Sequence, residues 1–309
     1  MSDPVETTFA ALHQRARRDV PIGPLTTYRV GGSAALFIEV ESDDDLALVG
    51  AAVATTGIRV LVVGKGSNLL VADAGFDGLA VALGAAFAGI AVDGTRVTVG
   101  GAAFLPVVAR RTAAAALTGF EWAVGVPGSI GGAVRMNAGG HGSDMTATLT
   151  RVRVVDLATG DDGWMSASAL ALGYRSSSIS STQLVVAAEL AMTPGDRDRS
   201  EAEIAEIVRW RRDNQPGGQN AGSVFTNPPG DSAGRLIDEA GCKGLRVGRA
   251  VVSDKHANFF IADPGGRADD VHALMTLVRR RVHDTQGVWL EPETRLVGFD
   301  ENPGLEVEG

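Results

Sequence analysis

Val63-Gly-Lys-Gly-Ser-Asn-Leu-Leu70 and Gly125-Val-Pro-Gly-Ser-Ile-Gly-Gly-Ala133 are the two most informative stretches of this chain. Their small residues allow backbone N–H groups to approach an anion closely, so together they predict a diphosphate held from two sides. Neither segment is a Walker P-loop, and neither matches the Gly-x-Gly-x-x-Gly dinucleotide fingerprint. Two ordinary tight turns are the alternative interpretation.

The composition indicates a globular protein with more than one domain. The 309 residues are 45% hydrophobic and 21% charged, and the formal net charge is −9. Basic residues are scattered rather than clustered, which argues against a nucleic-acid partner. The lone Cys242 excludes an internal disulfide and a cysteine-built metal site, and it is most simply a small buried hydrophobe. No signal peptide or apolar membrane span is visible, so we expect a cytoplasmic protein without a membrane partner.

The first glycine segment follows alternating strand and helix patterns. Residues 36–40 predict a strand, residues 43–54 a helix that opens on acidic side chains, and residues 59–63 an almost wholly apolar strand. An apolar run of this kind is typical of a buried parallel strand. The glycine segment would then lie at the carboxyl end of a strand, where open α/β sheets usually bind ligands.

The rest of the chain predicts further strands and three helices. Short strands within 90–99 turn at Asp93-Gly94, and strands are expected at 151–157 and 183–191. An alanine-rich helix should run from Pro106 to about Leu117. The polar stretch 194–199 is a candidate domain boundary, after which Ser200-Glu-Ala-Glu203 predicts a capping box at a helix start. Apolar residues from Val271 to Val282 recur at helical spacing before Gly287 and predict a helix of the terminal domain.

Four further motifs complete the pattern. They are Thr26-Thr-Tyr-Arg-Val-Gly-Gly32, Leu172-Gly-Tyr-Arg-Ser-Ser177, Asn220-Ala-Gly-Ser-Val-Phe-Thr-Asn-Pro228 and Leu290-Glu-Pro-Glu-Thr-Arg-Leu-Val-Gly298. In this order, and with the two glycine segments, they resemble the UDP-N-acetylenolpyruvoylglucosamine reductases. These are flavoenzymes that complete UDP-N-acetylmuramate for peptidoglycan. The resemblance covers roughly residues 26–298.

The resemblance implies an α+β fold. A two-lobed FAD-binding domain of the vanillyl-alcohol-oxidase type would span 21–193, with lobes of about 21–85 and 86–193. It would follow an N-terminal segment, 1–20, and precede a smaller α/β substrate-binding domain, 200–299, and a tail, 300–309.

The family's cofactors are non-covalent FAD and NADPH as electron donor. The residues that the resemblance assigns to FAD are Tyr28, Arg29, Gly64, Gly66, Ser67, Asn68, Leu69, Gly125, Pro127, Gly128, Ser129, Ile130, Gly131, Gly132, Ala133 and Asn137.

The sequence resembles one subclass of the family and differs from the usual family residues at two positions. No tyrosine lies between Arg175 and Ser223, which is typical of the shorter subclass that lacks an extra substrate-binding loop. His141 stands where the family usually has tyrosine, and Thr226 stands where a basic residue is common. The departures concern details of flavin and nucleotide contacts.

Three residues of these motifs are the candidate catalytic residues. Arg175 can make two parallel hydrogen bonds to the substrate carboxylate and stabilise the charge that hydride addition creates. Ser223 is the candidate proton donor, and Glu293 would either polarise the serine or act through its own protonated form. A surface salt bridge for Arg175 and an ordinary Gly-Ser turn for Ser223 are the alternatives.

The substrate contacts and partners are also expectations. Residues that suit the polar groups of a sugar nucleotide are Tyr174, Asn227, Lys243, Lys255 and His256, with solvated surface as the alternative for both lysines. The histidines are spread singly, so no catalytic metal is expected. The resemblance implies a monomer that binds UDP-N-acetylglucosamine enolpyruvate and NADPH. Competing hypotheses are an alcohol oxidase of the same flavin fold and a UDP-sugar-binding regulator that has lost flavin.

Overall fold

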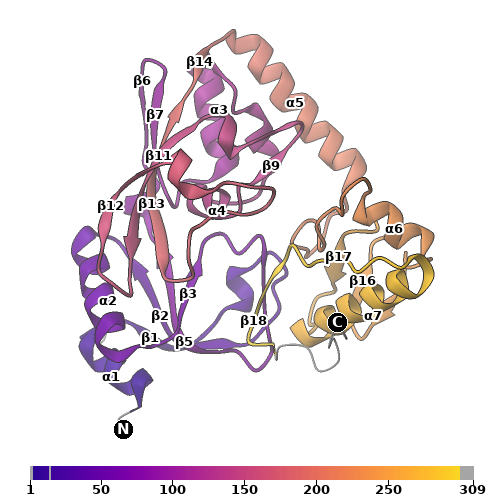
Figure 1. The fold of residues 1–309 in the computed structure, drawn as a ribbon, viewed down its shortest axis with the longest axis horizontal. Coiled ribbons are helices and arrows are strands. Elements are labelled where there is room, and N and C mark those ends of the chain that lie inside the picture. Colours follow the sequence, from indigo (N-terminus) through magenta and orange to yellow (C-terminus); the bar gives the residue numbers. More distant parts are fainter. Residues whose placement is uncertain (1–2, 14, 300–309) are drawn as a thin grey trace.

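A four-stranded sheet and two helices form the first lobe of the computed structural model, which describes residues 3–13 and 15–299 (Figure 1). The strands β1 (Arg17–Pro21), β2 (Ser33–Val40), β5 (Phe76–Leu83) and β3 (Val60–Val63) lie in the order β1-β2-β5-β3. All neighbours pair in parallel except β1 with β2. The expected strands at 36–40 and 59–63 are confirmed. Strand β1 and helix α1 (Pro4–Ala11) pack into this lobe, so we propose that the lobe includes residues of the expected N-terminal segment 1–20.

Helix α2 (Asp43–Thr56) confirms the expected helix at 43–54 and shows why the sequence is helical there. The Ser42 hydroxyl accepts the Asp45 N–H at 3.1 Å, and three aspartates occupy the positive end of the helix dipole. Leu46, Val49 and Val53 form the buried face. Gly57 ends the helix with a left-handed φ of 63°.

A five-stranded antiparallel sheet forms the second lobe. Its order is β12 (Asp162–Ser166), β11 (Leu149–Asp156), β13 (Gln183–Ala191), β7 (Arg96–Gly100) and β6 (Ile90–Asp93). The expected hairpin at 90–99 and the strands near 151–157 and 183–191 are confirmed. Helices α3 (Leu105–Ala114) and α4 (Ile130–Arg135) and the 3₁₀ turn η3 (Glu121–Gly125) share one core with the sheet.

The end of α3 differs from the prediction. The helix ends at Ala114, and Leu117–Thr118 instead forms β8, which pairs with β14 (Thr193–Pro194). Ala116 takes a positive φ of 55° to make this turn. Tertiary pairing therefore overrides the helix propensity of the alanine run.

Helix α5 (Arg197–Asn214) begins before the predicted capping box. Asp196 is the N-cap and accepts the Arg199 N–H at 2.8 Å, whereas the Ser200 hydroxyl is buried and donates to Glu121 Oε1 at 2.6 Å. Ile204 and Ile207 join the core of the second lobe. The helix thus belongs with that lobe, and we propose that the C-terminal domain begins after it, near residue 215.

The C-terminal domain combines two helices with a three-stranded sheet. The sheet consists of β15 (Arg246–Val247), β16 (Ala250–Val252) and β17 (Phe260–Ala262), and the helices are α6 (Ala233–Glu239) and α7 (Ala268–Gln286). The predicted last helix is confirmed, with its apolar face buried and Gly287 at its left-handed end. The expected tail 300–309 lies outside the described residues. None of the helices described is both long and apolar enough to span a membrane.

Strand β18 (Arg295–Val297) ties the C-terminal domain to the first lobe. It pairs in parallel with β4 (Leu69–Val71), which directly follows the first glycine segment (Figure 1). Tyr28, Val30 and Leu70 of the first lobe pack into the core of the C-terminal domain. Residues 295–297 are therefore placed beside residues that lie more than two hundred positions earlier.

Candidate functional site

The two glycine segments face each other. A Cβ added to Gly64 would lie 2.7 Å from Ser129 Oγ, and one added to Gly128 would lie 3.5 Å from Ser67 Oγ. Gly66 has φ +59°, and a Cβ there would lie 2.2 Å from the Leu25 carbonyl oxygen. Side chains at Gly64 and Gly66 would therefore close the gap between the segments or displace the first one.

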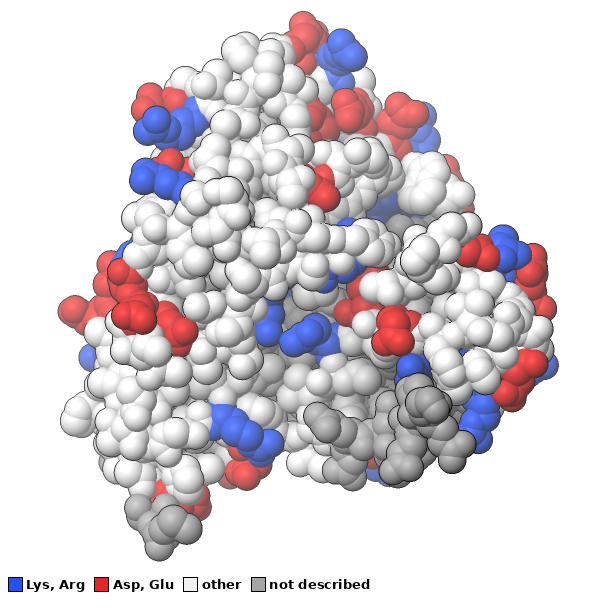
Figure 2. Space-filling model, viewed as in Figure 1, with Lys and Arg blue, Asp and Glu red and all other residues white. Residues whose placement is uncertain are grey.

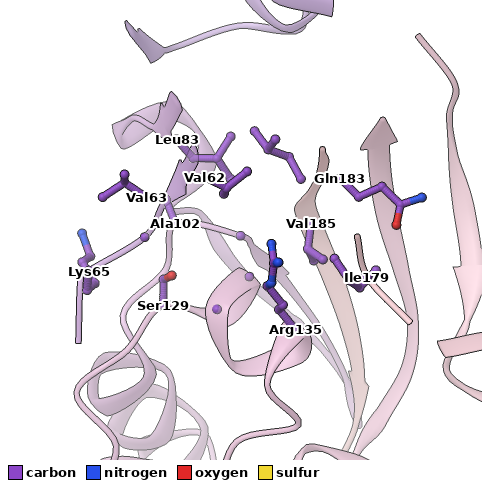
Figure 3. Close-up of a pocket in the computed structure, with 15 residues that line it drawn as sticks. Val62, Val63, Lys65, Leu83, Ala102, Ser129, Arg135, Ile179, Gln183 and Val185 are labelled. Atoms are coloured by element: carbon purple, nitrogen blue, oxygen red, sulfur yellow. The ribbon is translucent and has the colours of Figure 1, made fainter. Parts of the chain in front are cut away.

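A cavity of about 90 Å³ opens between the lobes and is lined by both segments (Figure 3). Its apolar walls include Val62 and Val63 of β3 on one side and Ala102 and Val185 on the other. The expectation that β3 is buried is wrong, because β3 is an edge strand whose residues 60–62 are only partly buried. Its apolar side chains line a cavity instead of a closed core.

The backbone donors of the two segments differ. In the described chain, no backbone N–H from Gly64 to Asn68 donates to another protein group. In the second segment, Ile130 N–H donates to the Ala103 carbonyl at 2.9 Å and Gly131 N–H to the Gly101 carbonyl at 2.8 Å. The first segment can therefore offer its N–H groups to an anion, and the second can offer those of Ser129 and Gly132, which have no protein acceptor among the described residues.

Other predicted cofactor residues fall into different environments. Tyr28 is fully buried in the C-terminal core, where burial raises the pKa of its hydroxyl, while Arg29 is exposed with φ +55°. Asn137 is 2% exposed, and its side-chain nitrogen donates to the Gly173 carbonyl at 2.9 Å. Its side-chain oxygen has no protein partner among the described residues, so it is available to a ligand donor.

Arg175 and Glu293 meet although they are far apart in the sequence. Arg175 Nε donates to Glu293 Oε1 at 2.9 Å, and Arg175 Nη2 donates to the Gly139 carbonyl at 3.0 Å. Arg175 has φ +54°, in a turn where Gly173 and Ser176 bridge. The Asn137 bond to Gly173 holds the same turn, so a residue just after α4 helps to position the arginine.

Ser223 lies next to the residue that binds the Glu293 backbone. Glu293 N–H donates to the Val224 carbonyl at 2.8 Å, and Phe225 bridges to Pro292. The Ser223 hydroxyl is partly exposed and has no protein partner within the part of the chain described. It is therefore free to bond a ligand.

The surroundings of Glu293 shift the pKa of its carboxyl group. Burial raises the pKa of its carboxyl group, and the charge and hydrogen bond of Arg175 oppose that shift without reversing it. Asn68 Nδ2 donates to the Glu293 carbonyl oxygen at 3.0 Å, so the first glycine segment holds the backbone of this residue. Arg175 and Glu293 thus place a fixed cation beside a carboxyl group that resists ionisation, and Ser223 belongs to the segment that binds the Glu293 backbone.

The predicted substrate-binding residues do not hydrogen-bond to one another, and most of them have other partners. Asn227 Oδ1 accepts the Ala233 N–H at 3.0 Å, at the start of α6. Lys243 pairs with Asp238 at 2.6 Å, and Lys255 donates to the Arg212 carbonyl at 2.6 Å. His256 Nδ1 accepts the Asn258 N–H. Burial is the main cause that lowers the pKa of the His256 imidazole. Tyr174 is 60% exposed and lies beside Arg175, with the guanidinium carbon 5.0 Å from the ring centroid.

Two basic residues that the sequence analysis missed also contact this region. Arg135 lines the cavity, and Arg211 of α5 donates to the Gly125 carbonyl and to Gln215 Oε1. Their local sequences are ordinary helix sequences, so no motif marks them.

The two residues that differ from the usual family residues, His141 and Thr226, both contact other residues. His141 packs edge-on against Trp210 with centroids 5.2 Å apart, and the Thr226 hydroxyl donates to the Glu291 carbonyl at 3.3 Å. Among the described residues, no cluster of His, Cys, Asp or Glu suits a metal ion.

Comparisons with known proteins agree with this architecture. Residues 34–162 match the family model "FAD binding domain", and residues 214–297 match "UDP-N-acetylenolpyruvoylglucosamine reductase, C-terminal domain". The curated UDP-N-acetylenolpyruvoylglucosamine reductase of Heliobacterium modesticaldum is 42% identical over 295 residues, covering 94% of this chain and 92% of the relative. That of Acidiphilium cryptum is 43% identical over 285 residues, with 91% of each chain covered.

A solved structure supports the same fold. The crystal structure of UDP-N-acetylenolpyruvylglucosamine reductase from Thermus caldophilus superposes with a TM-score of 0.81 at 36% identity, covering 92% of this chain and 99% of that one. The expected fold class, with a two-lobed FAD-binding domain before a smaller α/β domain, is confirmed.

Proposed function

The chain belongs to the UDP-N-acetylenolpyruvoylglucosamine reductase family, and we propose how its own residues perform that reduction. The chain is an FAD-dependent oxidoreductase of peptidoglycan synthesis that uses NADPH. The substrate is UDP-N-acetylglucosamine enolpyruvate, and the product is UDP-N-acetylmuramate. The observation that supports our assignment of residues is the bond between Arg175 and Glu293, next to the Ser223 segment and held by Asn68 of the first glycine segment and by Asn137, which follows α4.

The residues of the cavity suit FAD. Gly64 and Gly128 leave open a gap that side chains would fill, the N–H groups of the first segment are unpaired within the described chain, and the walls are apolar. We propose that the cofactor is held without a covalent bond by residues of the two glycine segments and by Asn137, namely Gly64, Gly66 to Leu69, Gly125, Pro127 to Ala133 and Asn137. When bound and reduced by NADPH, FAD would supply the hydride that the substrate's enolpyruvyl group accepts.

Arg175 acts on the substrate carboxylate. Hydride addition to the terminal carbon of the enol ether places negative charge on the adjacent carbon and on the conjugated carboxylate. A guanidinium oriented by Glu293 and Gly139 can stabilise this charge with no reorganisation at the moment of reaction.

Ser223 delivers the proton that completes the reduction. We assign its hydroxyl as the donor to the carbon next to the carboxylate, because it is accessible and has no competing protein partner in the described residues. Glu293 is the group that resupplies the proton, since its raised pKa keeps the acid form populated to higher pH. Arg175 orients this carboxyl group while it clamps the substrate.

The chain is proposed to act as a monomer in the cytoplasm. Both glycine segments and all three catalytic candidates come from one chain, so no second copy is needed to complete the site. A dimer mass in light scattering of the purified protein would contradict the monomer.

Separate half-reactions test the role of Ser223. With Ser223→Ala, we expect NADPH to reduce the bound flavin at nearly the wild-type rate, while reoxidation by the enolpyruvyl substrate slows about a hundredfold. Stopped-flow absorbance measures both rates, and Ser168→Ala on the exposed surface of the second lobe is the matched control. Equal damage to both half-reactions would mean that Ser223 positions the flavin. A purified protein that neither contains nor takes up flavin would favour the regulator hypothesis.

A further inference from the structure

Arg135 is the last residue of α4, the helix that follows the second glycine segment. Figure 3 shows its side chain rising into the cavity between Ser129 and Ala102 on one side and Ile179 and Val185 on the other. Its Nη1 donates to the Ser180 carbonyl at 3.1 Å, and its own carbonyl accepts the Ser177 hydroxyl at 2.7 Å. The helix and these two bonds fix where the guanidinium points.

The charge of Arg135 is not balanced by the protein that surrounds it. Within the described residues no carboxylate pairs with Arg135, Lys65 or Arg295, whereas Arg175 is paired with Glu293. Burial lowers the pKa of Arg135, and the positive charge of Arg295 lowers it further. Figure 2 shows basic side chains in the central hollow of the molecule. Two like charges held near each other in a partly buried site favour a bound anion.

The distribution of donors indicates which anion this is. The first glycine segment offers unpaired N–H groups, but Ile130 and Gly131 of the second segment donate theirs to the protein backbone. On the wall formed by the second lobe, Ser129 and Gly132 are left with N–H groups that have no protein acceptor among the described residues, and Arg135 is the cation that adds full positive charge to that wall. A guanidinium can bond two oxygens of a phosphate at once.

We propose that Arg135 binds the diphosphate of FAD from the second lobe, opposite the N–H groups of Gly64 to Asn68. This inference rests on the proposed flavin function. The diphosphate of FAD is favoured over that of the UDP-sugar because both glycine segments line this cavity, whereas Ser223 and Glu293 are not among the residues that line it.

The test compares ligands that differ only in phosphate. FAD release from the holoenzyme, followed by flavin fluorescence, gives the FAD affinity, and displacement by ADP or adenosine gives the contribution of the diphosphate. For Arg135→Gln we expect about tenfold weaker FAD binding and loss of most of the advantage of ADP over adenosine. Arg135→Lys should recover part of that advantage, because it keeps the charge. Arg110→Gln is the control, since Arg110 lies on the exposed surface of α3.

Several results would overturn the inference. One is an unchanged FAD affinity in Arg135→Gln, and another is an equal loss of ADP and adenosine, which would indicate that Arg135 only shapes the cavity. A selective loss of UDP binding would assign the arginine to the substrate. If Arg135→Gln does not fold, Arg135→Lys and the wild-type salt dependence decide, because FAD release that is insensitive to NaCl would exclude an ionic contact. Wild-type protein that binds no FAD would instead refute the proposed function.

Discussion

Asp73, in the turn after β4, caps a helix of another domain. Its Oδ1 accepts the Ala268 N–H at 3.1 Å, and its Oδ2 accepts the Asp269 N–H at 3.1 Å and Arg267 Nε at 3.1 Å. Asp269 returns the interaction by accepting the Asp73 N–H at 3.2 Å. The N-cap residue of α7, Arg267, has no side-chain cap bond of its own. Replacing Asp73 with alanine therefore removes the cap of α7 and a link between the first lobe and the C-terminal domain.

The expected cost follows from these contacts. Loss of an N-cap side chain typically destabilises a protein by about 1 kcal/mol, and about 2 kcal/mol in the strongest cases. The pair with Arg267 adds little, because that arginine is 65% exposed. We therefore expect Asp73→Ala to lower the free energy of unfolding by about 1.5 kcal/mol and the Tm by about 2 °C.

The pH dependence gives this prediction a second measurement. Hydrogen bonds from α7 and Arg267 outweigh burial and lower the pKa of Asp73. A lowered carboxyl pKa stabilises the fold above the ordinary value of about 3.9, and the contribution is lost as the pH falls through the folded-state pKa. The Tm difference between wild type and Asp73→Ala should thus be full at pH 7 and shrink below about pH 4.

Calorimetry of both proteins over this pH range is the assay. Asp77→Ala is the matched control, because Asp77 is 81% exposed and its contact with Arg59 is 3.5 Å long. A loss in Asp73→Ala no larger than in Asp77→Ala would refute the reasoning. A Tm difference that does not change with pH would exclude the carboxylate as the stabilising group.

Three further predictions concern the site. Arg175→Lys should lower kcat about a hundredfold with a smaller rise in KM, because lysine cannot reproduce the two-pronged geometry; an unchanged kcat would remove Arg175 from the mechanism. The rate of substrate reduction should fall as pH rises through the raised pKa of Glu293, and Glu293→Gln should abolish that limb of the profile; a limb that persists in the variant belongs to another group. Gly66→Ala should purify without FAD and with a free energy of unfolding lowered by about 2 kcal/mol. The control Gly57→Ala, at a glycine that is also left-handed but lies in open space, should retain FAD, and equal flavin content in the two variants would contradict the steric argument.

Local sequence patterns were sufficient to predict the helices whose ends are set by residues within or next to the helix itself. The Ser42 cap and Gly57 bound α2, and the apolar stripe before Gly287 marks α7, so periodicity and capping chemistry were sufficient there. The pairing of Arg175 with Glu293 could not be read from periodicity. Both residues were instead singled out by the ordered motifs that the chain shares with its family. Their catalytic roles in this protein are predictions.

The missed features depend on contacts between distant segments. Ser200 looked like a helix cap, yet its hydroxyl bonds Glu121 in the second lobe and Asp196 caps the helix instead. The alanine run before Leu117 looked helical to its end, but pairing with Thr193–Pro194 ends the helix early. Arg135 had no motif to mark it, because its significance arises only where the two lobes enclose a cavity.

Glu293 shows why the chemistry depends on how the domains are docked. Its N–H bonds Val224 of the C-terminal domain, its carbonyl accepts from Asn68 of the first lobe, and its carboxylate bonds Arg175 of the second lobe. A small rotation of the C-terminal domain would break the second and third bonds while each domain kept its own core. Catalytic geometry should therefore be lost before the fold is lost. For that reason Asp73→Ala, which removes a link between the first lobe and the C-terminal domain, should lower kcat more than it lowers the fraction of folded protein.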